Sequence, residues 1–295
     1  MEAGVRSVVD AADARPITDD LLIGDDGRPL TPLHPTSATP ARGFGGHVAA
    51  LALVAAYRTV PQALSVRYLH VEYIGAAPLD APPYFGVRSL QDGRSVARRL
   101  IEVTDGDRLI AMATAMFHHR DDQGPDHQVP MPGAADPGVT AFREVSRPRV
   151  LIRTYEKDRA YLLTWMRPEI LPLAEDPRLH EAALLYLSDL GILWPTLTAH
   201  GHDLDLRKRA LGTVAHSVWF HRRPRVDDWL LFEHTAPSTS SGLGHGEGRV
   251  FARDGVLLAT ATQTGLLRPG SGQAWGGRSR VSSSAVGGRE SARRP

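Results

Sequence analysis

Residues 98–117 read RRLIEVTDGDRLIAMATAMF, and residues 248–266 read GRVFARDGVLLATATQTGL. Each stretch has two runs rich in apolar and β-branched residues that are separated by an Asp-Gly pair. Such a pattern predicts a pair of antiparallel strands joined by a tight turn. Since the pattern occurs at the end of both halves of the chain, we infer that one structural unit is present twice.

The same order of elements precedes both hairpins. Residues 45–59 (GGHVAALALVAAYRT) are apolar on nearly every face and predict a buried helix. A second helix is predicted over LHEAALLYLSDLGILWPTL, from Leu179 to a stop near Pro195. An antiparallel meander follows each helix. Its strand-forming runs are SVRYLHVEYIGA, PPYFGVRSLQ, SVARRLIEV and RLIAMATAMFH, and then GTVAHSVWFHR, DWLLFEHTA, GEGRVFARDG and GVLLATATQTGLL.

These patterns divide the chain into five segments. We expect an α+β architecture in which each unit wraps an antiparallel sheet round its helix and the two sheets join. The run VLIRTYEKDRAYLLTWMRPE adds strands before the second helix. The segments are a leader with one edge strand at 21–23 (1–40), the first unit (41–119), a linker (120–148), the second unit (149–268) and a disordered tail (269–295).

Charge and composition exclude several classes of protein. The 34 basic and 33 acidic side chains nearly cancel, which argues against nucleic acid and against an anionic membrane surface as partners. The absence of cysteine excludes disulfides, thiolate nucleophiles and Cys-ligated zinc. The first residues lack the apolar core of a secretory signal, and no apolar run reaches the roughly 18 residues of a membrane span. We expect a cytoplasmic enzyme for a small molecule, assembled as a homodimer or a higher homo-oligomer.

Asp189 is the most unusual residue of the predicted second helix. It lies in LLYLSDLGIL, with leucines on the turns above and below. An isolated carboxylate in such a setting is costly unless it is hydrogen-bonded or has a raised pKa, and perturbed carboxylates cluster at functional sites. The alternatives are a solvated stripe shared with Ser188 or a cap for a helix break before Gly191. The first helix carries no acid, and this asymmetry favours function.

Gln263 gives a second asymmetry between the copies. When the two hairpins are compared, Thr114 matches Thr262, and Met116 stands opposite Gln263. A strand glutamine is more often an outward-facing residue than a functional one. Thr213 begins the strand TVAHSVWFHR, and threonine is common in strands. Neither residue predicts a site by itself.

Several common catalytic motifs are missing. His70, His216 and His221 fall in strand patterns without HExxH or HxxxH spacing, which argues against a zinc site. A Ser-His-Asp hydrolase would need a GxSxG elbow, and the sequence has none. The glycines of GFGGH and SSGLGHGEG lack the dinucleotide-binding spacing. They indicate turns or places where the backbone approaches a ligand.

Six segments of the chain, in order, match those of a known family: GFGGHVAALALVAA, YLHVEYIGAA, LQDGRSVARR, ALLYLSDLGIL, HSVWFHRRPRVDDWLLFEHTAPS and RDGVLLATATQTGLLR. Through these segments the chain resembles the bacterial and peroxisomal acyl-CoA thioesterase II family over about residues 42 to 268. That family has two fused hot-dog domains. The resemblance therefore implies two antiparallel sheets, each wrapped round a central helix and joined into one continuous sheet.

The resemblance also implies an activity and a catalytic trio. In this family an Asp, a Thr and a Gln orient and activate the water that hydrolyses acyl-CoA to a free fatty acid and CoA. The motifs place them at Asp189, Thr213 and Gln263. The family usually carries an acid before the His of HSxWFHR and another after the Gln, where this chain has Ala215 and Thr264.

The chemistry itself assigns roles. Thioester hydrolysis needs a nucleophilic water, a base that takes its proton and donors that stabilise the oxyanion. Asp189 is the expected base. We expect Gly45, Gly46 and His70 to bind substrate, the two glycines through backbone amides at the start of the first helix. No metal or bound cofactor is required.

Two further interpretations stay open. A duplicated fold of this type could bind acyl-CoA as a scaffold without turnover, and Ala215 favours that interpretation. A hydratase of the same fold would need an Asp and a His close together, and no such pair is evident. Arg98 and Arg99 are candidates for pairing with the phosphates of CoA.

Overall fold

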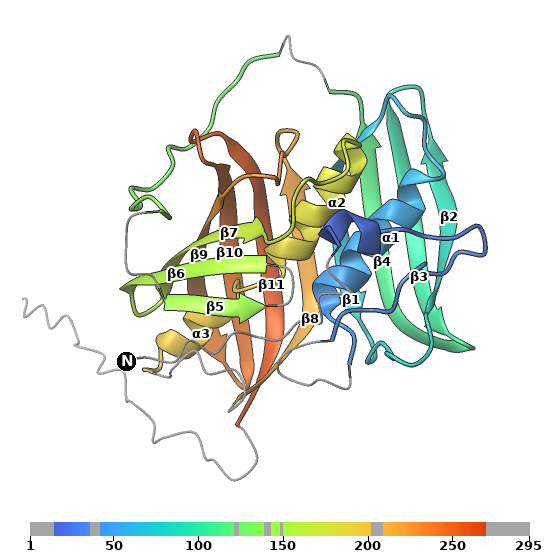
Figure 1. The fold of residues 1–295 in the computed structure, drawn as a ribbon. Coiled ribbons are helices and arrows are strands. Elements are labelled where there is room, and N and C mark those ends of the chain that lie inside the picture. The colour runs from blue at the N-terminus through green and yellow to red at the C-terminus, as the bar shows by residue number, and fades with distance from the viewer. Residues whose placement is uncertain are drawn as a thin grey trace, which may run out of the picture.

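The computed structural model describes residues 15–35, 42–120, 124–138, 143–147, 150–201 and 209–269. In this part of the chain, eleven strands form one sheet in the order β2-β3-β4-β1-β8-β11-β10-β9-β7-β6-β5. The sheet curves round two neighbouring helices, α1 (Gly45–Tyr57) and α2 (Pro177–Ser188) (Figure 1). The expected tail lies outside the described residues except for Pro269, where the last strand ends.

Each unit supplies the four strands that its sequence predicted. Gly106 and Gly255, in the two Asp-Gly turns, have φ values of +57° and +93°, a conformation that favours glycine. The strands are β1 (Ser65–Tyr73), β2 (Tyr84–Asp92), β3 (Val96–Asp105) and β4 (Arg108–His118) in the first unit, and β8 (Arg209–Phe220), β9 (Leu230–Ser240), β10 (Leu243–Ala252) and β11 (Leu257–Pro269) in the second.

The two units share one sheet because β1 pairs with β8. This antiparallel ladder runs from Tyr68 opposite Trp219 to Glu72 opposite Ala215. All of the strand pairs in the sheet are antiparallel. The expected α+β double hot-dog arrangement is therefore confirmed.

Three further strands extend the second unit beyond β9. They are β5 (Arg143–Arg147), β6 (Val150–Asp158) and β7 (Tyr161–Pro168). The last two come from the run that predicted strands. The first lies inside the segment expected to be a linker, so the connection between the units is shorter than we inferred from its proline and glycine content.

The leader differs from the expectation of an edge strand. A short 3-10 helix, η2 (Ile17–Asp20), precedes Leu21, and both Ile17 and Leu21 are buried. Ile23 forms an isolated bridge with Pro29 and belongs to no named strand. Leu21 and Ile23 therefore anchor the leader on the core by burial rather than by pairing within the sheet, whereas Leu22 is exposed.

The second predicted helix is interrupted. α2 ends at Ser188, and the chain turns at Gly191, which has a φ of +84°. A short helix, α3 (Trp194–Thr198), follows. Pro195 was expected to stop the helix, but it lies in the first turn of α3, where its missing N–H costs no helical hydrogen bond.

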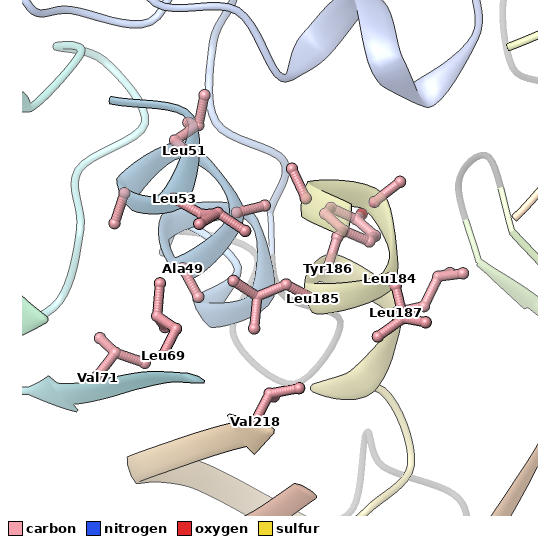
Figure 2. Packing of buried hydrophobic residues seen from close by; sticks show 14 of the residues in the cluster. Ala49, Leu51, Leu53, Leu69, Val71, Leu184, Leu185, Tyr186, Leu187 and Val218 are labelled. Atoms are coloured by element: carbon pink, nitrogen blue, oxygen red, sulfur yellow. The ribbon is translucent and has the colours of Figure 1, made fainter. Parts of the chain in front are cut away.

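The helices are held on the sheet by apolar contacts. α1 is buried on nearly every face, as its composition predicted. Figure 2 shows Ala49 of α1 and Leu185 of α2 near Leu69 of β1 and Val218 of β8, at the junction of the two units. Burying each large apolar side chain contributes roughly 1.5–3 kcal/mol. This core fixes the start of α1 beside the end of α2.

Candidate active site

Asp189 lies at the C-terminal end of α2, where it is the C-cap residue. The residue is half-buried, while Ser188 before it is buried. It therefore does not share a solvated stripe with Ser188. Because Gly191 turns the chain away two residues later, the carboxylate can reach across to the start of α1.

The backbone of α1 meets this carboxylate. The Gly46 N–H donates to Asp189 Oδ2 at 2.9 Å. The start of a helix carries a partial positive charge and unpaired N–H groups, so it stabilises an anion. A Cβ atom on Gly46 would lie 2.6 Å from the backbone oxygen of Tyr186 and 2.6 Å from the ring of Phe44. Glycine is needed here for the helix to approach α2.

Two side chains of the second unit complete the cluster. The Gln263 Nε2 donates to Asp189 Oδ1 at 2.6 Å and to Thr213 Oγ1 at 2.5 Å. Thr213 Oγ1 also lies 3.4 Å from Asp189 Oδ1. The amide nitrogen of Gln263 must face these atoms, because its oxygen would repel the carboxylate. The structure thus brings Asp189, Thr213 and Gln263 together with Gly46.

A β-bulge gives Thr213 its direction. His216 pairs with Gln263, and both side chains are buried on the face that carries the helices. In a regular strand a residue three positions from His216 would face the other way. The pairing of β8 with β11 skips Val214, so that Thr213 joins the buried face.

Burial governs the charge state of the cluster. It raises the pKa of Asp189 to about 6, and the hydrogen bonds from Gly46, Gln263 and Thr213 act in the opposite direction. Such a carboxylate is ionised at neutral pH, and it accepts a proton more readily than an exposed aspartate. The arrangement can therefore hold a water molecule and take a proton from it.

Tyr73 was missed by the sequence reasoning. Its hydroxyl donates to the carbonyl oxygen of Gly45 at 2.8 Å. Burial, and then the nearby charge of Asp189, raise the pKa of the Tyr73 phenol well above its usual range. Leu69 and Val71 are buried on β1, so strand alternation from them would have placed Tyr73 on the same face.

The expected substrate-binding residues do not all lie together. Gly45 borders the site, since a Cβ on it would lie 3.2 Å from Asp189 Oδ2. His70 lies on the opposite face of the sheet. Its Nδ1 is 2.7 Å from Ser217 Oγ, and its Nε2 is 3.5 Å from Glu72. The structure therefore separates His70 from Asp189.

The strand register corrects the comparison of the two hairpins. Met116 is half-buried on the other face of β4 and is not the counterpart of Gln263. The counterpart of Gln263 is Ala115, because Ala115 occupies the same buried position on β4 as Gln263 does on β11. From the turn onward, the buried face of β11 carries Ala259, Ala261 and Gln263, and that of β4 carries Ala111, Ala113 and Ala115.

The residues that pair with Ala115 on β3 and with Gln263 on β10 also differ. Ala115 pairs with Arg99, whereas Gln263 pairs with Gly246. The buried guanidinium of Arg99 donates to the side chains of Asp92 and Ser89 and to both the backbone oxygen and the hydroxyl of Thr59. These bonds occupy the guanidinium of Arg99, which argues against this candidate for pairing with a phosphate of CoA. Arg98, exposed on the other face, bonds to the Gln91 side chain.

Ala215 and Thr264 lie away from the cluster. They pair with each other across β8 and β11, and they alternate with the buried His216 and Gln263. Both therefore face the side of the sheet without the helices, where Thr264 Oγ1 lies 3.1 Å from His245 Nδ1. A residue at either position has no direct contact with the carboxylate of Asp189.

No group of three His, Cys, Asp or Glu side chains with metal-binding geometry occurs among the described residues. Within the same ranges, no helix is both long and apolar enough to cross a membrane.

Comparison with known families identifies both units. The sequence profile of the acyl-CoA thioesterase N-terminal domain matches residues 34–118, and that of the acyl-CoA thioesterase C-terminal domain matches residues 119–267. The chain is also 24% identical to acyl-coenzyme A thioesterase 8 of Mus musculus, over 88% of each chain.

Solved structures agree with these matches. An acyl-CoA thioesterase II, TesB2, of Mycobacterium marinum is 30% identical, with a TM-score of 0.70, and the match covers 78% of this chain and 91% of that one. A tesB protein of Mycobacterium avium subs paratuberculosis is 26% identical, with a TM-score of 0.73, over 85% of this chain and 97% of the other.

Proposed function

This chain belongs to the acyl-CoA thioesterase II family of thioester hydrolases, and we propose that it hydrolyses acyl-CoA to a free fatty acid and CoA with a water activated by Asp189, Thr213 and Gln263. One observation carries the proposal. A half-buried carboxylate with a raised pKa lies within hydrogen-bonding distance of a helix N-terminus and an amide side chain. Such a group is suited to take a proton near neutral pH.

The hydrogen-bond inventory of Gln263 suggests where the water sits. Both hydrogens of its Nε2 are committed, one to Asp189 and one to Thr213. Its Oε1 is buried and has no donor within the described ranges. A buried acceptor of this kind is costly unless a ligand or water supplies the donor. We therefore assign Gln263 Oε1 as the acceptor for one O–H of the water and Asp189 as the acceptor for the other.

The reaction then proceeds in two steps. The water oxygen attacks the thioester carbon as Asp189 takes a proton, so a C–O bond forms and a tetrahedral oxyanion develops. Collapse of this intermediate breaks the C–S bond, and the proton passes from Asp189 to the leaving sulfur of CoA. The products are a carboxylic acid and a free thiol. Holding the water in place supplies an entropic advantage.

The start of α1 is suited to stabilise the oxyanion. The first amides of a helix have no acceptor within the helix. Gly45 opens α1, and a Cβ on it would meet both Asp189 and Tyr73 at 3.2 Å. Tyr73 and Asp189 therefore lie close against Gly45, and the Gly46 N–H already donates to Asp189, so the Gly45 N–H is the amide of this backbone that would polarise a thioester carbonyl.

The scaffold interpretation receives no support from the position of Ala215. That residue faces the side of the sheet away from Asp189, so its lack of a carboxylate leaves the cluster unchanged. Loss of turnover would need a change within the cluster itself.

A panel of acyl-CoA substrates of varied chain length, assayed by released thiol, tests the function. We expect turnover by the wild type. Replacing Gln263 with alanine should lower kcat by about tenfold to 100-fold, because the water loses its orienting acceptor and Asp189 loses a hydrogen-bond donor.

Thr262→Ala is the matched control for Gln263→Ala. Thr262 is the preceding residue of the same strand, and it faces the opposite side of the sheet. We expect its kcat to stay within about twofold of the wild type. Tight acyl-CoA binding without thiol release by the wild type would support the scaffold, and equal losses in both variants would contradict the proposed role of Gln263.

The pH dependence of the reaction is a separate prediction. Because Asp189 acts as a base, only its ionised form is active, and burial raises its pKa from 3.8 to about 6. We expect kcat/KM to be constant above about pH 7 and to fall about tenfold per pH unit below the pKa. The measurement is a rate profile from about pH 4.5 to pH 8 with a stability control at each pH. An acid limb with its midpoint near 4 would contradict a desolvated base.

A further inference from the structure

Tyr73 and Asp189 contact the two ends of one peptide group. The Tyr73 hydroxyl donates to the carbonyl oxygen of Gly45 at 2.8 Å. The N–H of Gly46, which belongs to the same peptide plane, donates to Asp189 Oδ2 at 2.9 Å. The peptide between Gly45 and Gly46 therefore connects the phenol of β1 to the carboxylate at the end of α2.

The bare Cα of Gly45 makes this arrangement possible. A Cβ atom there would lie 3.2 Å from the Tyr73 hydroxyl, 3.2 Å from Cζ of its ring and 3.2 Å from Asp189 Oδ2. All of these distances are tighter than ordinary van der Waals contact. Tyr73 and Asp189 thus both lie against the position that a side chain on Gly45 would occupy, which is an observation independent of the hydrogen bonds.

A hydrogen bond to a peptide oxygen polarises the whole group. It makes the N–H on the other side a stronger donor, since chains of hydrogen bonds strengthen one another in a low-dielectric interior. It also fixes the rotation of the peptide plane. Both effects favour the charged form of Asp189, which accepts from that N–H.

We propose that Tyr73 is a positioning residue, which holds the peptide between Gly45 and Gly46 so that its N–H stays directed at Asp189 Oδ2. The proposal rests on the assignment of Asp189 as the base. Tyr73 does not touch the reacting atoms in this role. Its effect is on the protonation equilibrium of Asp189.

The surroundings of Asp189 make the effect measurable. Among the described residues, the hydrogen-bond partners of its carboxylate are Gly46, Thr213 and Gln263, none of which titrates. His216, on the neighbouring strand, is bonded to Ser188, and burial lowers its pKa to about 3. It stays uncharged in the range of the assay. Burial, and then the charge of Asp189, raise the pKa of Tyr73, so the two groups are electrostatically coupled.

The test is Tyr73→Phe, which removes the hydroxyl and keeps the ring. We expect the pKa of Asp189 to rise by about half a unit or more, so that kcat/KM one unit below the wild-type midpoint falls about threefold. At about pH 8 the variant should be close to the wild type. Two measurements are needed: the pH–rate profile, and the carboxyl titration of protein carrying 13C-labelled aspartate, with Asp189→Asn used to assign the signal.

Tyr68→Phe is the matched control. Tyr68 lies on the same strand but contacts Trp219 on the other face, so neither readout should move. A Tyr73→Phe variant with an unchanged Asp189 titration, or with an equal loss at every pH, would overturn the proposal. The NMR titration needs no turnover, so it tests Tyr73 even if acyl-CoA proves not to be the substrate.

Discussion

Replacing Asp189 with asparagine is expected to lower kcat by about 100-fold or more, with acyl-CoA binding largely retained. The amide keeps the shape of the side chain but cannot accept a proton at neutral pH. Gly46 and Gln263 donate to different oxygens of the carboxylate, so the single amide oxygen of asparagine can keep one of these two bonds. Thiol release and ligand affinity, measured on the same purified proteins, check this prediction.

The stability of the Asp189→Asn variant should move in the other direction. The pKa of Asp189 is raised on folding, so the folded protein binds this proton more tightly than the unfolded chain does. The carboxylate therefore lowers stability progressively as pH rises from about 4 to about 6. At pH 7 the asparagine variant should be at least as stable as the wild type. At low pH, where both states are protonated, the two proteins should differ less.

Glu181→Gln is a control on the same helix. Glu181 is a buried carboxylate of α2 that is hydrogen-bonded to Tyr57 and, at 3.0 Å, to Arg120. Breaking this buried network should lower stability and leave kcat within a few-fold of the wild type. If Asp189→Asn behaved like Glu181→Gln, with altered stability and a near-normal kcat, Asp189 would not be the base.

Replacing Gly246 with alanine is expected to lower the thermal midpoint by about 5–12 °C and to reduce activity with it. The added Cβ would lie 2.2 Å from the backbone oxygen of Ile192, a contact that a side-chain rotation cannot relieve. Ile192 belongs to the segment that follows Asp189, so relief of the clash must move either that segment or β10. Thermal unfolding followed by circular dichroism measures the effect.

Gly212→Ala is the comparison for Gly246→Ala, because Gly212 is also a strand glycine. It is exposed, and an added Cβ would meet no atom within 4 Å. The thermal midpoint of the Gly212→Ala variant should differ from that of the wild type by less than about 2 °C. A Gly246→Ala variant as stable as Gly212→Ala would show that Ile192 does not lie against β10 as described.

Local patterns predicted the parts of the fold that depend on local interactions. The apolar run of α1 and the alternating strands around both Asp-Gly turns appear where the sequence placed them. The break after α2 was considered only as an alternative for Asp189, because leucines continue through it, and the turn depends on Gly191 in the left-handed region. The strand β5 was missed because its pairing with β6 is a tertiary interaction.

The site could be predicted only in part for a similar reason. Asp189 was conspicuous as an acid among leucines, whereas Thr213 and Gln263 depended on the family resemblance. Tyr73 gave no signal of its own, since tyrosine is common in strands and its partner is a backbone oxygen. The bulge that turns Thr213 inward depends on strand register, which residue types do not reveal.

Arg99 pairs with Ala115, and Gly246 pairs with Gln263 at the equivalent position of the second unit. This difference could not exist in a symmetric homodimer of single units. In such a dimer a twofold axis repeats every substitution, so one residue must serve at both places. Here Arg99 fills one of these positions with a guanidinium that ties β3 to Asp92, while Ile192 leaves no room for a side chain on Gly246 at the other. A single gene that encodes both copies can meet the two demands separately, so each half can specialise in its own part of the molecule.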